Sequence, residues 1–299
     1  MCDTVTGDRH SRSDDARFPR RGPSRRMFLG GVVTAGVATA GGVLFGGGVA
    51  AAALPSVNME AVLKAAQIDP RRPDTALTPG AKASVVLVEQ ALADRGLLDS
   101  SYVDGHFGTR TVTAYAAYQK SLGYSGLDAS GLPGATSLTK LGTDRFGVTN
   151  KISAGARAGF RGVTLNARTK AMLLAAEGLY GATVVLTQGS YNVGGDPASA
   201  GTHDGGGAMD ISVSGISAAN RTKLVGKLRA VGFAAWLRTP DQADWPFHIH
   251  AEAISDPDLS SGAQHQVGDY YLGKNGLASG APDDGPQITK VTWEEYQRA

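Results

Sequence analysis

The chain has 299 residues, of which 42% are hydrophobic and 19% are charged, and this fits two small globular domains with additional non-globular segments. Its single cysteine, Cys2, lies near the N-terminus, which excludes a disulfide framework and a thiolate metal site in the folded part. The formal net charge of +2 is set by residues 1–26, with seven arginines and four aspartates, whereas the remaining 22 basic and 23 acidic residues give no electrostatic basis for nucleic-acid binding.

Residues 1–53 have the pattern of an export signal. A polar, arginine-rich stretch ends in SRRMFL at 24–29, and an apolar run of glycine, alanine and valine follows. This resembles a twin-arginine signal peptide, and the small residues Ala51 and Ala53 suit cleavage before Leu54. The resemblance implies a secreted, cell-wall protein that contacts the membrane only transiently. The apolar run is also long enough for an uncleaved membrane anchor, and this alternative stays open.

Residues 54–76 are expected to be a linker between this leader and the first domain. A short helical stretch, NMEAVLKAAQ at 58–67, is followed by DPRRP at 69–73. Two prolines and mixed charge in the second stretch interrupt regular structure, so we expect the first domain to begin at residue 77.

Residues 77–143 are expected to form a domain of three helices. Apolar residues at helical spacing predict a first helix at 80–95, and a turn with two glycines at 103–109 leads into a second helix. A second glycine-containing turn then precedes a short third helix that carries Leu138 and Leu141.

The stretch DGHFGTRTVTAYAAYQ at 104–119, with the turn that follows it, resembles the small three-helix peptidoglycan-binding domain. The resemblance covers nearly all of residues 77–143 and implies that peptidoglycan is the partner. Most matching positions build turns, caps or core, and we expect Phe107 and Tyr118 in the core rather than on a glycan-binding surface.

Residues 144–273 predict a second domain of the α+β class. Asn166 caps a helix that Gly181 ends, and Ser217 caps another. His265 lies in a polar stretch and is expected to be solvated. Residues 274–299 are expected to form an extended tail with a short terminal helix, whose Trp293 and Tyr296 dock on the domain. In the second domain, helices are predicted at 167–180 and 218–231, and strands are predicted at 183–186, 209–213, 233–237 and 247–252.

Two short blocks, GTHDGGGAMDI at 201–211 and FHIHAE at 247–252, hold three of the six histidines. Side chains alternate between the two faces of a strand, so His248, His250 and Glu252 are expected on one face, with about 6.6 Å between successive members. Imidazole and carboxylate groups from two such strands can converge on one point.

His203, Asp210 and His250 are the predicted metal ligands. The glycines at 205–207 predict a tight turn rather than a helix between His203 and Asp210, and Asp210 points away from the apolar side of its strand. Two imidazoles and one carboxylate would satisfy a zinc ion and leave one coordination position open.

The pattern His203-x-x-Gly206-x-Ala208-x-Asp210, followed by His248-x-His250, resembles the zinc D-alanyl-D-alanine carboxypeptidase family, which includes phage L-alanyl-D-glutamate endopeptidases and the hedgehog signalling domain. The resemblance covers about residues 160–255. It implies a small α+β domain with an antiparallel sheet, and it implies zinc bound by the same three residues.

Active members of that family place an acidic base three residues before the last histidine, where this chain has Phe247, which cannot accept a proton. The candidate catalytic residues are therefore His248 and Glu252, with Asp204 and Asp244 from the loops as further candidates. Each also has a structural alternative: His248 as a fourth ligand or the partner of a ligand, and the acidic residues as turn formers or solvated side chains.

Together these patterns predict an exported cell-wall protein that binds peptidoglycan and hydrolyses a peptide bond in its stem or cross-bridge peptides. Attachment to the wall would raise the local concentration of a polymeric substrate. The alternative is a non-catalytic peptidoglycan-binding protein with a structural or ligand-binding zinc site. A glycosidase would need two placed carboxylates, and no such pair stands out.

Overall fold

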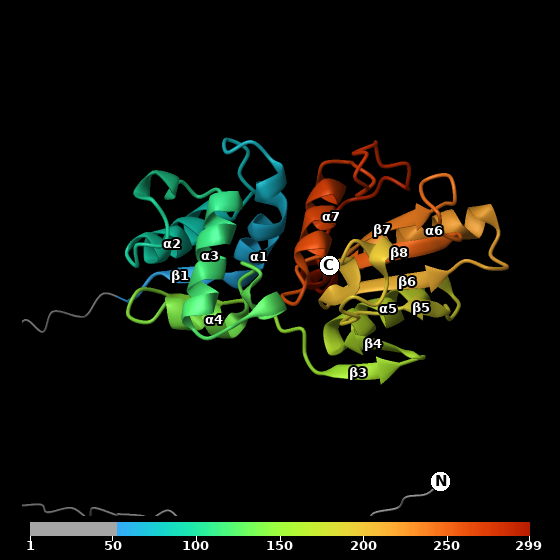
Figure 1. The fold of residues 1–299 in the computed structure, drawn as a ribbon, viewed down its shortest axis with the longest axis horizontal. Helices are drawn as coiled ribbons and strands as arrows, with labels where there is room; N and C mark the ends of the chain where they lie inside the picture. The colour runs from blue at the N-terminus through green and yellow to red at the C-terminus, as the bar shows by residue number, and fades with distance from the viewer. Residues whose placement is uncertain (1–52) are drawn as a thin grey trace, which may run out of the picture. The chain divides into compact units, whose positions relative to one another are not determined.

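The computed structural model describes residues 53–299, which have the predicted α+β class (Figure 1). The signal peptide predicted at 1–53 lies, but for its last residue, outside this range. Within the described range, no helix combines the length and the apolar character that a bilayer crossing requires.

The helices are α1 (Met59–Ile68), α2 (Lys82–Ala93), α3 (Thr109–Ser121), α4 (Ala135–Leu141), α5 (Ala167–Tyr180), α6 (Ala218–Ala230), α7 (Ser261–Tyr271) and α8 (Trp293–Arg298). The strands are β1 (Ser56–Asn58), β2 (Gly147–Thr149), β3 (Arg157–Phe160), β4 (Val163–Asn166), β5 (Leu186–Gln188), β6 (Ala208–Ser212), β7 (Phe233–Arg238) and β8 (His248–Ala253).

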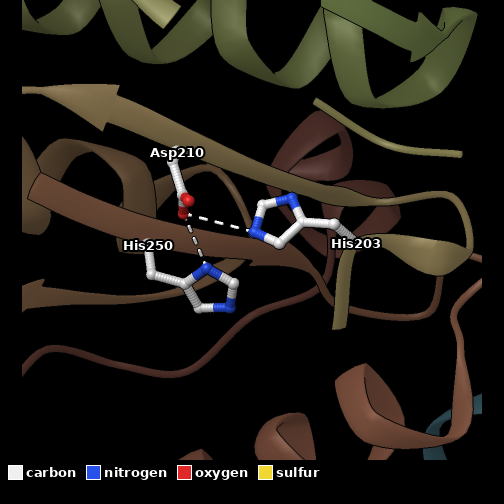
Figure 2. A group of neighbouring side chains, drawn as sticks. All are labelled: His203, Asp210 and His250. Atoms are coloured by element: carbon white, nitrogen blue, oxygen red, sulfur yellow. Dashed lines mark hydrogen bonds and ion pairs between the residues drawn. The ribbon is translucent and has the colours of Figure 1, made fainter. Parts of the chain in front are cut away.

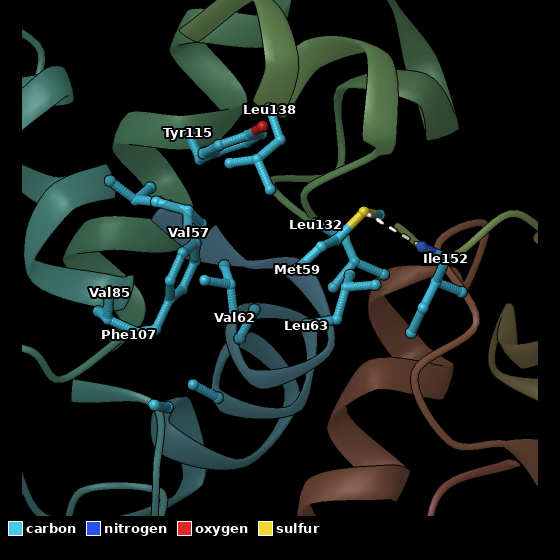
Figure 3. Close-up of a cluster of buried hydrophobic side chains, with 14 of the residues drawn as sticks. Val57, Met59, Val62, Leu63, Val85, Phe107, Tyr115, Leu132, Leu138 and Ile152 are labelled. Carbon is cyan, nitrogen blue, oxygen red and sulfur yellow. Dashed lines mark hydrogen bonds between the residues drawn. The ribbon is translucent and has the colours of Figure 1, made fainter. Parts of the chain in front are cut away.

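The three helices predicted for 77–143 are α2, α3 and α4, and their apolar faces meet in one buried cluster (Figure 3). Phe107 and Tyr118 are buried in this cluster, with 0% and 3% of their surface exposed. Tyr118 also donates its hydroxyl to the carbonyl of Ser137 at the start of α4. Both rings therefore belong to the core, as the sequence predicted.

The segment 54–76 differs from the predicted linker, because it is packed into the same cluster. Strand β1 pairs in parallel with β2, and Asn58 caps α1 by accepting hydrogen bonds from the N–H groups of residues 60 and 61. Met59, Val62 and Leu63 of α1 are fully buried (Figure 3). Their spacing of three and four residues gives α1 an apolar face, which is why the segment packs instead of extending.

The main sheet has the strand order β5-β6-β8-β7 and is antiparallel throughout. Helices α5 and α6 cover one face, where Ile211 and Ile249 are fully buried. Strand β5 begins at Leu186, later than the strand predicted at 183–186. The reason is that the N–H of Val184 donates to the Glu177 carboxylate near the end of α5 instead of to a strand partner. The other face of the sheet is left for α7 and for polar side chains.

Helix α7 was not predicted, because its sequence SGAQHQVGDYY has few strongly apolar residues. Ser260 caps it, and Val267 and Tyr270 are buried against α1 and the sheet. The last segment ends in α8, as predicted, and both Trp293 and Tyr296 pack against the core on the α5–α6 side of the sheet.

Candidate metal centre

The glycine turn at 205–207 passes tightly against the segment that follows β8. A Cβ on Gly205 would lie 2.3 Å from the carbonyl oxygen of Asp258, and Gly207 has φ of +81°. The N–H of Gly206 donates to the same carbonyl oxygen at 2.7 Å. Only glycine allows this approach and this conformation, so the turn fixes where the chain enters β6.

Strand register brings the two sequence blocks together. Asp210 on β6 is the direct partner of His250 on β8, and His250 is in turn paired with Trp236 on β7. Because side chains alternate, His250 and Glu252 lie on the face of the sheet opposite to Ile249. This is the face predicted from the sequence.

The three predicted ligands converge (Figure 2). Asp210 Oδ1 lies 2.8 Å from His250 Nδ1 and 3.4 Å from His203 Nε2. One donor atom from each residue lies within 4.8 Å of the other two. His203 and His250 are buried, and Asp210 is partly buried.

The second nitrogen of each imidazole is held by the protein. His203 Nδ1 lies 2.9 Å from the carbonyl oxygen of Gly189, and His250 Nε2 lies 3.1 Å from Glu252 Oε1. His203 Nε2 and His250 Nδ1 therefore remain for a shared centre beside Asp210. Metal-binding histidines are typically oriented in this way by a carbonyl or carboxylate, so these residues can hold a metal ion.

The electrostatics of this group favour a cation. Burial tends to raise the pKa of Asp210, but hydrogen bonds with His203 and His250 outweigh burial and hold it well below its usual range. Burial tends to lower the pKa of His250, but its bonds to Asp210 and Glu252 raise it to about 9. Both shifts show that the two carboxylates stabilise positive charge between them, as they would a bound metal ion.

The group lies at the wall of a cavity of about 710 Å³. His248 also lines this cavity, and its Nδ1 lies 2.9 Å from the carbonyl oxygen of Pro246. Burial lowers the pKa of His248 below its usual value, which favours the neutral ring. Glu252 differs from His248, because 0% of its surface is exposed and it does not line the cavity. Its carboxylate contacts the His250 ring instead. Of the two candidate catalytic residues, His248 alone is open to a ligand.

The remaining base positions considered from the sequence do not line this cavity. Phe247 lies on the other side of the strand, where the Arg221 guanidinium of α6 is 4.9 Å from its ring centre. Asp204 accepts a hydrogen bond from the N–H of Gly194, and Asp244 is exposed in the loop before β8. A carboxylate side chain introduced at position 247 would therefore lie on the α6 side of the sheet and not in the cavity.

The lining residues that were not assigned to the site from the sequence include Gln188, Asp196, Arg238 and His265. Arg238 extends the strand predicted at 233–237 by one residue, so alternation from Trp236 would have placed it on the site face. His265, expected to be solvated, is half-exposed on α7 and faces this cavity, because α7 packs across the open face of the sheet. Asp196 begins a short turn, and no pattern in the sequence connects it with the site.

The centre is thus a buried group of two imidazoles and one carboxylate with an open cavity on one side and a neutral histidine beside it. Three protein donors leave coordination positions of a divalent cation free for water or a ligand. Comparisons of the chain with protein-family models, with curated proteins and with solved structures find no match.

Proposed function

We propose that this protein is exported to the cell wall, binds peptidoglycan and hydrolyses a peptide bond in its stem or cross-bridge peptides with zinc as cofactor. The observation that carries the proposal is the convergence of His203, Asp210 and His250 at the wall of an open cavity. Two imidazole nitrogens and one carboxylate oxygen, without a thiolate, are a donor set that zinc accepts in catalytic sites.

Zinc held by His203, Asp210 and His250 would supply Lewis acidity toward a peptide carbonyl and toward the attacking water. His248 is the residue best placed to take up the proton that the attacking water gives up. Its Nδ1–H donates to the Pro246 carbonyl, so Nε2 keeps its lone pair, and burial keeps the ring neutral. Glu252 holds the His250 ring and exchanges no proton with a ligand.

Peptidoglycan as the polymer is supported by the resemblance of 104–119 to a wall-binding domain and by the three helices α2, α3 and α4 within 77–143. Wall attachment would supply the stem peptides at high local concentration to a site on the same chain. The twin-arginine pattern at 24–29 supports export to the place where this polymer lies.

The test is digestion of purified, insoluble peptidoglycan with the protein of residues 54–299, followed by mass analysis of the released fragments. We expect peptide fragments that disappear with a chelator and return with zinc. His203→Ala should abolish both zinc binding and the release of peptide fragments. His248→Gln should still bind zinc but should release fragments about 100-fold more slowly.

The same incubation decides the alternative. The protein should sediment with the polymer whether or not zinc is present. Sedimentation without any zinc-dependent fragment would favour the non-catalytic wall-binding protein, and fragments without sedimentation would remove the wall-binding part of the proposal.

A further inference from the structure

A second cavity, of about 480 Å³, is lined by residues of both the helical part and the sheet part of the chain. The helical part contributes Asp128 from the short turn Gly126–Ala129 and Thr136 from the start of α4. The sheet part contributes Arg157, the first residue of β3, and Asp258, which follows β8. We call this cavity the junction cleft. It shares no lining residue with the cavity of the metal-binding group, so it is a separate site.

The sheet side of the junction cleft is a polar surface that its own contacts hold in place. The Arg157 guanidinium carbon lies 3.9 Å from the centre of the Tyr191 ring. The Tyr191 hydroxyl donates to Asp258 Oδ2 at 2.7 Å and accepts from Asn166 Nδ2 at 3.1 Å. Arg157 Nη2 donates to the same Asp258 Oδ2 at 3.4 Å, so Asp258 Oδ1 remains to accept a hydrogen bond from a ligand. The side chain of Arg157 is 55% exposed and offers the cleft a flat cation backed by an aromatic ring.

The rest of the lining adds a further ring and hydroxyl groups. Tyr124, partly buried, lines the cleft from the helical part. Ser130 accepts a hydrogen bond from the N–H of Leu132, and Ser153 accepts one from the N–H of Gly155, so each keeps its O–H to donate. Donors and acceptors therefore lie side by side with flat groups. Sugars match this surface, because each hydroxyl both donates and accepts and the C–H faces of the rings pack on flat side chains.

The charges of the junction cleft favour a neutral ligand. Its charged lining residues are Arg157, Asp128 and Asp258, which are one cation and two anions. The cation is already paired, since Arg157 Nη2 lies 3.4 Å from Asp258 Oδ2, and Asp128 is exposed. A peptide with free carboxylates would be repelled by Asp128 and would find no uncompensated cation in return. An uncharged saccharide avoids this repulsion.

The junction cleft adjoins the metal centre through one segment of the chain. Gly205 lines the cleft, and His203, two residues earlier, is a proposed metal ligand. The N–H of Tyr191 donates to the carbonyl of Gly205 at 2.8 Å, and the N–H of Asn192 donates to the carbonyl of His203 at 2.9 Å. A polymer held in the cleft would therefore run beside the segment that carries His203, and peptides attached to it would start close to the metal centre.

We propose that the junction cleft binds the neutral saccharide chain of peptidoglycan, held by Tyr124 of the helical part and by Arg157 and Asp258 of the sheet part. The resemblance of residues 77–143 implies wall binding by the helices alone, whereas this cleft makes the metal-bearing part a second contributor. Its volume falls in the range of about 300–1,000 Å³ that is usual for ligand sites. The inference rests on the proposed function and names where the polymer is bound and which of its components is recognised.

The test uses chitotetraose, an uncharged tetramer of β-1,4-linked N-acetylglucosamine that carries no peptide. Calorimetric titration of the zinc-free protein of residues 54–299 should show one saturable site. Arg157→Ala and Tyr124→Ala should each lower the affinity about tenfold or more. The matched controls are Arg110→Ala and Tyr102→Ala, because the Arg110 guanidinium also lies over a tyrosine ring, 5.9 Å from the centre of Tyr102, but outside the cleft. Both controls should keep the affinity of the unaltered protein.

Absence of saccharide binding, or an unchanged affinity in Arg157→Ala and Tyr124→Ala, would overturn the inference. Binding of a free stem peptide that is tighter than binding of the tetramer and is lost in Arg157→Ala would also overturn it, because the cleft would then take a peptide. If circular dichroism shows that Tyr124→Ala is unfolded, Tyr124→Leu keeps an apolar side chain without the flat ring and should still weaken binding several-fold. Arg157→Lys keeps the charge without the planar group and should weaken binding as well.

The two proposals fail separately. Zinc-dependent release of fragments by a protein whose affinity for the tetramer does not depend on Arg157 would leave the peptidase and remove the role of the cleft. Tetramer binding that depends on Arg157, in a protein that releases no fragments, would leave the saccharide site and remove the peptidase.

Discussion

Glu252 illustrates how a single buried residue can act through its neighbour. Its Oε1 holds His250 Nε2, while its Oε2 has no hydrogen-bond partner in the described structure. Burial raises the pKa of this carboxyl above its usual value, against the attraction of His250 and Arg238. A carboxylate kept in such surroundings serves to fix the tautomer and the direction of the His250 ring.

Glu252→Gln should therefore weaken zinc binding by about 10- to 100-fold, because the amide cannot hold the His250 ring with a full negative charge. Competition with a chromophoric chelator measures this affinity directly. Glu295→Gln, which removes a carboxylate from α8 far from the cavity, is the control and should leave zinc affinity unchanged. An unaltered affinity in Glu252→Gln would mean that the sheet alone positions His250.

At the scale of elements, the connection between α6 and β7 depends on one glycine. Gly232 has φ of +103°, and a Cβ there would lie 2.6 Å from the backbone nitrogen of Trp293. This turn therefore needs glycine both for its conformation and for the close approach of α8. Gly178 in α5 differs, because a Cβ at that position would meet nothing within 4 Å.

Gly232→Ala should lower the free energy of unfolding by about 2 kcal/mol or more, since both strain and a backbone clash oppose it. Gly178→Ala should raise it by about 0.5–1 kcal/mol, because alanine favours the helix. Urea titrations followed by circular dichroism compare the two variants. Equal effects would show that the α6–β7 turn can relax away from α8.

At the scale of the whole molecule, the helical part and the sheet part share a core. One buried cluster joins α1, α2 and α3 to Trp236 of the sheet and Tyr270 of α7. Helix α8 adds ion pairs from Glu295 to Lys64 and from Arg298 to Glu60, both on α1. These contacts tie the segment expected to be a linker to the domain that carries the metal centre.

Residues 53–299 should therefore unfold in a single calorimetric transition. Leu63→Ala should lower the free energy of unfolding of the entire chain by about 2–5 kcal/mol, because it leaves a cavity in the shared core. Leu174→Ala, at a position 44% exposed on α5, should change it by less than about 0.5 kcal/mol. Two separate transitions, with Leu63→Ala shifting one of them, would show independent domains instead.

The sequence by itself determined the local features of this protein. The Asn166 cap and the Gly181 stop of α5 are present as predicted, and Gly181 has φ of +89°. The glycine turn after His203 and the strand faces of Asp210 and His250 were also predictable, because they are properties of short segments. Their convergence on one point depends in addition on the pairing of β6 with β8.

Only the tertiary structure decided what surrounds these features. The pairing of β7 with β8 places Arg238 beside the centre, and the loop before β8 turns Phe247 toward α6. Packing against α7 and the helical core made α1 part of the fold instead of a linker, although its apolar spacing was visible in the sequence. Register, and the choice of partner for an apolar face, are set by contacts between residues far apart in the chain, so a reading of local patterns cannot determine them.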